Sequence, residues 1–241
     1  MAVVHRSVDA VGVADLPYRE RASRVAGAVV WRRRTRQVSP SRILPDGCMD
    51  LIWHDGGLLI AGPDREAFVG PVGVGGSYVG LRFPPGVGPA VFGVPATELV
   101  NQRVPLADVW SPAEVRRITD AAAAGDIAGA LERVAGARLE SAGPDPVAAR
   151  VVERLDAGRS VHEIAADLAL SERQLHRRCL AAFGYGAKTL GRIRRMQRAL
   201  AMPASVPAAL VAATTGYADQ AHLTREVRAL AGVPFGRVSR S

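Results

Sequence analysis

The strongest constraint on the fold is a repeat in the last third of the sequence. With an offset of 48 residues, SERQLHRRCLAAFG (171–184) aligns with DQAHLTREVRALAG (219–232), so that Arg177 matches Arg225. Each copy follows a short Ala-rich stretch and a connection of three or four residues. Helix, tight turn and helix, found twice, predict two helix-turn-helix units.

A segment rich in arginine joins the two copies. KTLGRIRRMQRALAM (188–202) carries Leu190, Ile193 and Met196 at helical spacing, and Pro203 follows it. Periodic apolar residues that end at a proline predict one long helix. Such a stiff spacer would let both second helices enter successive major grooves, about 34 Å apart on one face of DNA.

In a helix-turn-helix unit, the first turns of the second helix face the base edges. Glutamine suits adenine, arginine suits guanine, and alanine or threonine can touch a thymine methyl group. Side chains of this chemistry gather near the start of each second helix. We predict that the following residues contact DNA: Ser171, Arg173, Gln174, His176, Arg177, Gln220, Ala221, His222, Thr224 and Arg225.

The distribution of charge also favours a nucleic-acid partner. Residues 1–145 contain 16 basic and 16 acidic residues, whereas residues 146–241 contain 15 basic and 7 acidic residues. The whole net charge of +8 therefore lies in the part that carries the repeat. A basic domain of this kind is typical of proteins that bind polyanions.

The N-terminal part has a different pattern. Short β-branched or aromatic runs alternate with glycine- and proline-rich turns across residues 24–92, which predicts a small antiparallel barrel or sandwich. Helices are expected at 112–124 and from Asp126 onward, and the segment 141–146 (SAGPDP) is the best linker. We therefore predict an α+β protein with a β-rich domain at 1–143 and an all-α domain at 144–241.

The tail resembles the DNA-binding domain of the AraC family of bacterial transcription regulators. The resemblance is carried by Gly216-Tyr217-Ala218-Asp219, by Leu223-Thr224-Arg225, and by Gly232-Val233 with Pro234. It covers about residues 146–238 and implies sequence-specific binding of double-stranded DNA. The N-terminal half resembles a sensor-like module of such regulators, marked by Leu44-Pro45-Asp46-Gly47 and by the stretch from Gly80 to Gly86. This second resemblance implies no particular ligand.

These features lead us to expect a transcription regulator controlled by a small molecule or a partner acting on the N-terminal domain, without catalysis or a cofactor. A ligand site there would draw on aromatic residues and a central arginine. The candidates are Trp31, Trp53, Tyr78 and Arg82. Arg82 can pair with an anionic ligand or with Asp50, and the pattern does not decide between them.

Two alternatives stay open. Cys48, Asp50 and His54 fall on one face of a predicted strand, which allows metal sensing, thiol sensing or catalysis, while Leu51 and Trp53 would face the core. No fourth ligand and no catalytic signature accompany them, so we expect no metal. The second alternative is a protein-interaction adaptor whose helix-turn-helix units no longer bind DNA.

The expected location is the cytoplasm. The sequence has no apolar run of 18 residues and no secretory pattern at its start. Its two cysteines are too few for a disulfide framework. We expect no membrane partner. Homodimerisation fits paired operator sites, although no heptad pattern predicts it.

Overall fold

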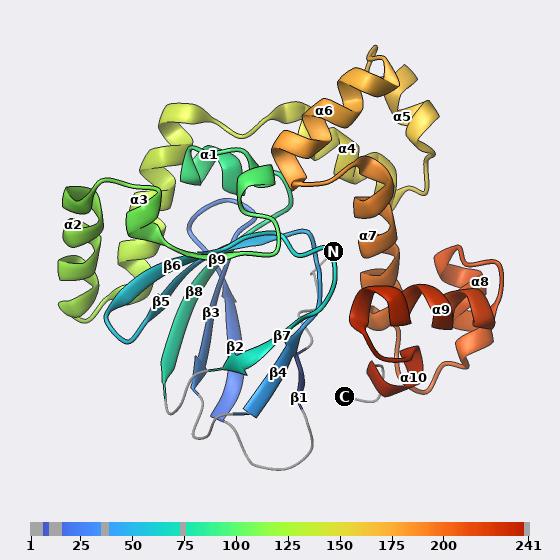
Figure 1. Cartoon of the computed structure of the whole chain (residues 1–241), viewed down its shortest axis with the longest axis horizontal. Helices are drawn as coiled ribbons and strands as arrows, with labels where there is room; N and C mark the ends of the chain where they lie inside the picture. Colours follow the sequence, from blue (N-terminus) through green and yellow to red (C-terminus); the bar gives the residue numbers. More distant parts are fainter. Residues whose placement is uncertain (1–6, 10–15, 35–38, 73–75, 239–241) are drawn as a thin grey trace.

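The computed structural model describes residues 7–9, 16–34, 39–72 and 76–238. The N-terminal part is built from antiparallel sheets with helices packed on them, and the C-terminal part is helical (Figure 1). The predicted α+β class is therefore confirmed.

Two antiparallel sheets form the N-terminal part. The first has six strands in the order β2-β3-β8-β5-β6-β9, and the second has three in the order β1-β4-β7. The strands of the first sheet are β2 (Leu16–Ala22), β3 (Val29–Arg34), β8 (Ser77–Phe83), β5 (Met49–His54), β6 (Gly57–Ala61) and β9 (Arg103–Pro105). Those of the second are β1 (Ser7–Asp9), β4 (Ser39–Ile43) and β7 (Phe68–Val72).

The β5–β6 hairpin shows how the sequence specifies this sheet. Asp55 and Gly56 form a two-residue turn in which both φ angles are positive, 46° and 85°, and this turn type matches the twist of paired strands. Leu51 and Trp53 of β5 are buried in the core beneath the helices. Alternation places Asp50, Ile52 and His54 on the opposite face, as predicted.

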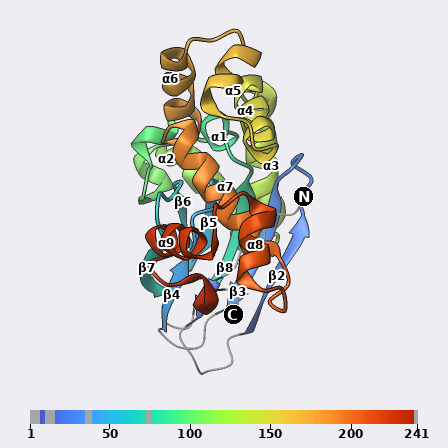
Figure 2. The same cartoon turned by 90° about the vertical axis from the view of Figure 1, so that its right-hand side faces the viewer.

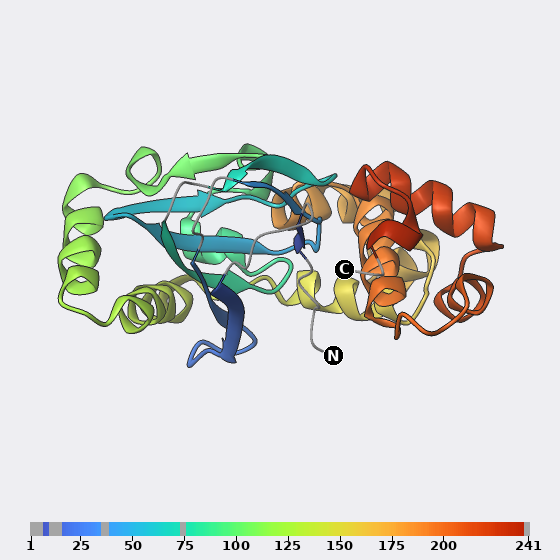
Figure 3. The same ribbon diagram turned by 90° about the horizontal axis from the view of Figure 1, so that it is seen from below.

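Helices cover one face of the six-stranded sheet. They are α1 (Gly88–Phe92), the 3-10 helices η1 (Ala96–Glu98) and η2 (Leu106–Asp108), α2 (Pro112–Ala123) and α3 (Ile127–Ala142). The predicted capping box of Ser111 and Glu114 begins α2, and Asp126 caps α3. In Figure 3, α2 and α3 lie at the end of the molecule opposite to the C-terminal helices.

The C-terminal part has seven helices within its described residues. They are α4 (Pro146–Asp156), α5 (Val161–Asp167), α6 (Glu172–Phe183), α7 (Ala187–Ala201), α8 (Ala208–Thr215), α9 (Gln220–Ala231) and α10 (Phe235–Val238). Helices α6 and α9 begin 48 residues apart, so the repeat is a structural repeat. Figure 2 shows α7 running between the unit α5–α6 and the unit α8–α9. None of the helices in the described part of the chain is both long and apolar enough to cross a membrane.

The two large apolar cores of the described residues correspond to the two halves of the chain, and a small third cluster contains Trp31, Ile52 and Ala61. One contains buried residues between Val25 and Ala135, and the other contains residues between Ala148 and Val238. Leu44 is the exception, because it comes from the N-terminal half but packs in the second core. Pro45, the residue after Leu44, also contacts the C-terminal part. Its carbonyl oxygen accepts a hydrogen bond from Nε2 of Gln197 in α7 at 2.7 Å.

Glu132 ties α3 to the β2–β3 hairpin. Its carboxylate is 3% exposed and accepts hydrogen bonds from the Arg21 guanidinium, from Ser23 Oγ and from the backbone N–H of Arg24. The hydrogen bond from Arg21 is the largest influence, and together these donors lower the pKa of Glu132 to about 2. Because the folded-state pKa lies below the ordinary value, this stability is present above pH 4.5 and is lost as pH falls toward 2.

We expect Glu132→Gln to lower the free energy of unfolding by about 2 kcal/mol at pH 7, because Arg21, although half exposed, loses a charged partner. Chemical denaturation at several pH values measures the effect. The difference between wild type and variant should shrink between pH 4.5 and 2. Glu140→Gln, at an exposed position of the same helix, is the control and should change stability little.

Candidate nucleic-acid interface and inter-sheet cavity

Helices α6 and α9 have the same orientation with respect to the sheets. Both begin on the side away from the β-rich part and end beside it (Figure 1). At the end of α6, Nη2 of Arg65 donates to the carbonyl oxygen of Gly184 at 3.2 Å. At the end of α9, Nη1 of Arg42 donates to the carbonyl oxygen of Ala231 at 2.8 Å. The C-terminal ends are therefore held by the N-terminal part, and the first turns face outward.

All the predicted residues in the first turns of α6 are exposed, but two of them form hydrogen bonds within their own helix. Arg173, His176 and Arg177 are exposed. Ser171 and Gln174 form a capping box, in which the Ser171 Oγ accepts from the Gln174 N–H and the Gln174 Oε1 accepts from the Ser171 N–H. These two side chains form hydrogen bonds with free backbone N–H groups at the start of their own helix. Contact with a base would therefore require breaking the capping hydrogen bonds.

The first turns of α9 contain both exposed and half-buried residues. Gln220, Ala221 and Arg225 are exposed. His222 is half-buried, and its Nδ1 accepts a hydrogen bond from the backbone N–H of Ala218 at 3.2 Å. Thr224 is also half-buried, and its hydroxyl donates to the carbonyl oxygen of Gln220. The side chains of α9 that reach furthest outward are therefore the glutamine and the arginine.

The prediction for α9 omitted Arg228. This arginine lies one turn after Arg225 and is exposed. Residues three apart lie on the same face of a helix, so the sequence already indicated that Arg228 lies beside Arg225.

The arginines of α7 stabilise the arrangement of the two units. Arg194 is 7% exposed and forms a two-pronged ion pair with Asp156 of α4. Arg192 forms another with Glu226 of α9, at 2.7 and 3.1 Å. Planar pairs of this kind fix orientation as well as distance. The linking helix is thus joined to the first unit and to the second recognition helix.

A cavity of about 250 Å³ lies between the two sheets. All six strands of the first sheet contribute to one wall, and β4 and β7 contribute to the other. The lining residues are Tyr18, Trp31, Arg33, Ile43, Leu44, Asp46, Cys48, Asp50, Ile52, His54, Leu59, Ala61, Gly62, Asp64, Phe68, Tyr78, Arg82 and Arg103. This is a mostly apolar pocket with a few convergent charges, which is the usual character of a small-molecule site.

The structure brings most of the predicted ligand residues into this cavity. Trp31, Tyr78 and Arg82 line it, whereas Trp53 lies on the opposite face of β5, in the core. The sequence left open whether Arg82 pairs with Asp50 or with an anionic ligand. In the structure Arg82 pairs with Asp50, at 3.3 Å between Nε and Oδ1.

Cys48, Asp50 and His54 also line the cavity, as their shared face predicted. Burial, reinforced by the nearby Asp46 carboxylate, raises the pKa of the Cys48 thiol well above its ordinary value, which disfavours the reactive thiolate. The His54 ring stacks on Tyr78 with centroids 3.9 Å apart. Within the described part of the chain, no hydrogen bond joins His54 to Cys48. Among the described residues, no group of three His, Cys, Asp or Glu side chains is placed to hold a metal ion.

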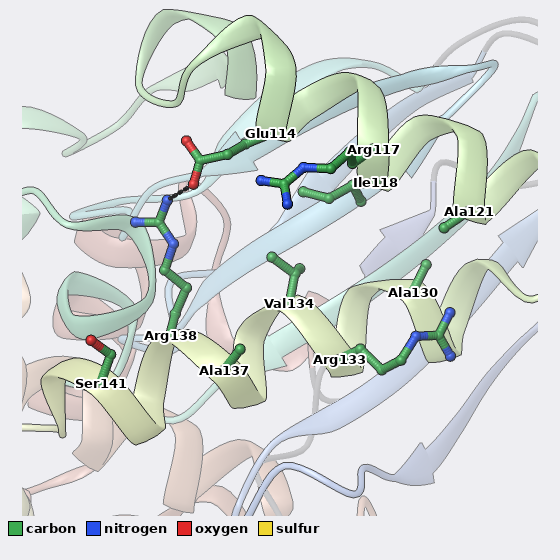
Figure 4. Close-up of a pocket in the computed structure, with 10 residues that line it drawn as sticks. All are labelled: Glu114, Arg117, Ile118, Ala121, Ala130, Arg133, Val134, Ala137, Arg138 and Ser141. Carbon is green, nitrogen blue, oxygen red and sulfur yellow. Dashed lines mark hydrogen bonds and ion pairs between the residues drawn. The ribbon is translucent and has the colours of Figure 1, made fainter.

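A second hollow of about 550 Å³ lies between α2 and α3 (Figure 4). Small apolar side chains such as Ala121 and Val134 form its floor, and Arg138 reaches across to Glu114 at 2.6 Å. The Arg138 guanidinium also lies 4.0 Å from the centre of the Trp110 ring. Glu114 and Arg138 thus join the two helices, and none of the predicted site residues lines this hollow.

Comparison with known proteins agrees with this architecture. Residues 150–241 match a family model described as a helix-turn-helix domain, and residues 28–105 match one described as a domain of unknown function (DUF6597). No curated protein matches the chain.

Among solved structures, ToxT from Vibrio cholerae O395 is 7% identical, with 88% of this chain and 96% of that chain covered and a TM-score of 0.45. An apo variant of ToxT from Vibrio cholerae strain SCE256 is 8% identical, with 91% and 99% covered and a TM-score of 0.48. Likenesses at this level carry no argument about ligands or sites. Residues 150–241 therefore carry a helix-turn-helix domain, and the repeated units and the domain match confirm the resemblance of this part of the chain to the AraC family of DNA-binding transcription regulators.

Proposed function

We propose that α6 and α9 read base edges of a duplex operator, and that a small molecule in the inter-sheet cavity controls this binding. The mechanism is a shift in the population of DNA-competent arrangements, without chemistry on a substrate. A division into an effector domain at 1–143 and a DNA-binding domain at 144–241 fits the two separate apolar cores. Helices α6 and α9 each have an outward first turn.

The proposed base contacts are the exposed side chains of the two first turns. They include Arg173, His176 and Arg177 on α6 and Gln220 and Arg225 on α9. Arginine and glutamine offer the two-pronged hydrogen bonds that distinguish guanine and adenine in the major groove. Ser171, Gln174, His222 and Thr224, which are engaged within their own helices, have a supporting role in this proposal.

The observation that carries the regulatory part is a pair of segments shared by the cavity and the DNA-binding helices. In the first, Asp46 and Cys48 line the cavity while the adjacent Pro45 accepts a hydrogen bond from α7. In the second, Asp64 lines the cavity while the adjacent Arg65 holds the end of α6. A ligand that moves either segment therefore also moves a helix that sets the placement of the two recognition helices.

Selection of bound sites from random duplexes with the full chain tests the DNA-binding part. We expect a paired site whose halves lie one helical turn apart, and an affinity that falls about 1,000-fold between 50 and 200 mM salt, because arginines displace counterions from several phosphates. Enrichment of no sequence by a folded protein would favour the adaptor alternative. Sedimentation on the selected site would show whether the predicted homodimer forms.

A further inference from the structure

A groove of about 560 Å³ separates the two helix-turn-helix units. One side comes from the end of α4 and the start of α5, and the other comes from the first turns of α9. Helix α7 contributes the largest share of the lining and runs between the two units (Figure 2). The lining residues are Leu155, Arg159, Ser160, Val161, Ala187, Lys188, Gly191, Arg192, Arg195, His222 and Glu226.

The groove carries an excess of positive charge. Its basic side chains are those of Arg159, Lys188, Arg192 and Arg195. The carboxylate of Glu226 also lines it, and a two-pronged hydrogen bond from Arg192, with smaller contributions from His222 and Arg195, lowers the pKa of Glu226 and keeps it ionised. Outside the lining, Glu163 pairs with Arg159 at 3.0 Å. Two carboxylates thus balance two of the four cations, and two positive charges remain.

Lys188 and Arg195 are the cations of the groove that form no ion pair within the described part of the chain. Lys188 is exposed. Arg195 is half-buried, and its guanidinium lies 5.5 Å from the centre of the Tyr217 ring. Because Tyr217 is itself 5% exposed, a fixed aromatic face positions this guanidinium and leaves its N–H donors for another partner.

The cations of α7 lie in a row. Lys188, Arg192 and Arg195 follow at intervals of four and three residues, which places them on one face of the helix. The seven residues from the first to the last span about 10 Å along the helix axis. A duplex carries one phosphate charge for about every 1.7 Å of its own axis, so a stretch of backbone across the groove would present several phosphates to this row.

The groove lies between the first turns that we propose to read bases. His222 lines it and stands between Gln220 and Arg225 in the first turns of α9. On the other side, Nδ1 of His162 in α5 lies 3.1 Å from Oε1 of Glu172 in the first turn of α6, so the starts of these two helices are joined. Where two recognition helices occupy successive major grooves, the stretch of duplex between them is a minor groove bordered by both backbones.

We propose that the groove between the units binds phosphodiester groups of the DNA backbone midway between the two half-sites, with Lys188 and Arg195 as the contacting side chains. This deepens the proposed function and rests on it, because the duplex must engage both α6 and α9 for its backbone to reach α7. Phosphate contacts carry no sequence information directly, so these contacts fix the register of the two units on the duplex. Arg192 stays with Glu226 and holds α9 against α7.

Salt titrations of DNA binding by the full chain test the contact. Lys188→Gln and Arg195→Gln each remove one charge, and affinity for the selected operator and for a scrambled duplex should fall alike, by about 5-fold for each variant. The slope of log affinity against log salt should become shallower by about 0.9 for each variant, because one counterion fewer is released.

Two further variants serve as controls for the salt titrations. Arg195→Lys keeps the charge and should keep the slope, and Arg116→Gln, at an exposed position of α2, should change neither affinity nor slope. Unchanged affinity and slope in Lys188→Gln and Arg195→Gln would overturn the proposal. A loss confined to the operator would assign base contacts to these residues and would overturn it as well.

Neutral phosphates locate the contact on the duplex. Operators with methylphosphonate groups midway between the half-sites lose charge without losing bases, and they should bind the wild-type chain about 5-fold more weakly than the unmodified operator. Lys188→Gln should lose little further affinity on them, because its contact is already absent. Methylphosphonates outside the paired site are the control and should affect neither protein. Equal losses for the wild type, Lys188→Gln and Arg195→Gln on the central substitution would contradict the proposal.

Two more outcomes separate this site from a different ligand and from the proposed function. Pyrophosphate at fixed ionic strength represents a small phosphorylated ligand, and its binding through Lys188 with unchanged DNA affinity in Lys188→Gln would assign the groove to a free anion instead. Failure of the full chain to select any duplex would contradict base reading by α6 and α9. Selective operator binding that is insensitive to Lys188→Gln, to Arg195→Gln and to central methylphosphonates would contradict the phosphate site alone.

Discussion

Replacement of both Arg177 and Arg225 by alanine is expected to weaken binding to the selected operator by at least about 100-fold. Each arginine is exposed on the outward part of a recognition helix, and a two-pronged arginine–guanine contact contributes about 1–3 kcal/mol of discrimination. The single variants should each lose about 10-fold or more. Fluorescence anisotropy at fixed salt, with operator and scrambled duplexes, measures both affinity and selectivity.

The scrambled duplex decides what kind of contact is lost. An arginine that reads a base should cost affinity for the operator only, whereas an arginine that contacts phosphate should weaken both duplexes alike and reduce the salt dependence. Arg116→Ala removes an exposed arginine from α2, far from the recognition helices, and should change neither affinity. Equal losses on both duplexes would assign Arg177 and Arg225 to the phosphate backbone.

Replacement of Gly184 by alanine is expected to separate the end of α6 from the N-terminal part. Gly184 has a φ of 78°, and a Cβ there would lie 2.2 Å from Val100 Cγ2 and 3.1 Å from the Ala96 carbonyl oxygen. The left-handed conformation costs alanine about 1–2 kcal/mol, and overpacking adds about 1–3 kcal/mol more. We expect thermal unfolding at a temperature lower by about 5–10 °C, because the wedge acts at an interface between both cores.

Gly216→Ala provides a matched control. Gly216 also ends a helix with a left-handed φ, of 82°, but nothing lies within 4 Å of its added Cβ. Its variant should show the backbone cost alone, about 1–2 kcal/mol. Thermal melts of both variants, compared with their operator affinities, distinguish a loss of stability from a loss of the contact between α6 and the N-terminal part. A Gly184→Ala protein no less stable than Gly216→Ala would show that the interface around α6 tolerates the wedge.

The helices of the C-terminal part were predictable because their signals are local. Apolar residues at helical spacing, Ser171 and Asp219 as caps, and the closing glycines all act within a few residues of the helix that they define. The two-residue turn at Asp55 likewise specifies its own hairpin. Strands β2 and β4 were not predicted, because LPYRERA and SPSRI are held in their sheets by pairing with distant strands and have no clear alternation of their own.

The candidate site was predictable only as a set of residue types. The Ser171–Gln174 box follows the same local pattern as the Ser111–Glu114 box, so the engagement of Gln174 could have been predicted. The sequence pattern did not show that His222 accepts a hydrogen bond from the backbone of its turn, because that contact depends on a rotamer adopted within the folded unit. Trp53 was grouped with Trp31 because both are aromatic, but the two-residue alternation of β5 sends it into the core.

By itself, the sequence determined the two helix-turn-helix units, the linking helix and the excess of positive charge, since short-range hydrogen bonding and apolar periodicity specify them. Only the tertiary structure decided that carboxylates of different strands meet around Arg82, and that Arg42 and Arg65 hold the ends of both recognition helices. Such contacts join residues up to 189 positions apart, and their energy depends on burial and on a geometry that sheet pairing and core packing create together.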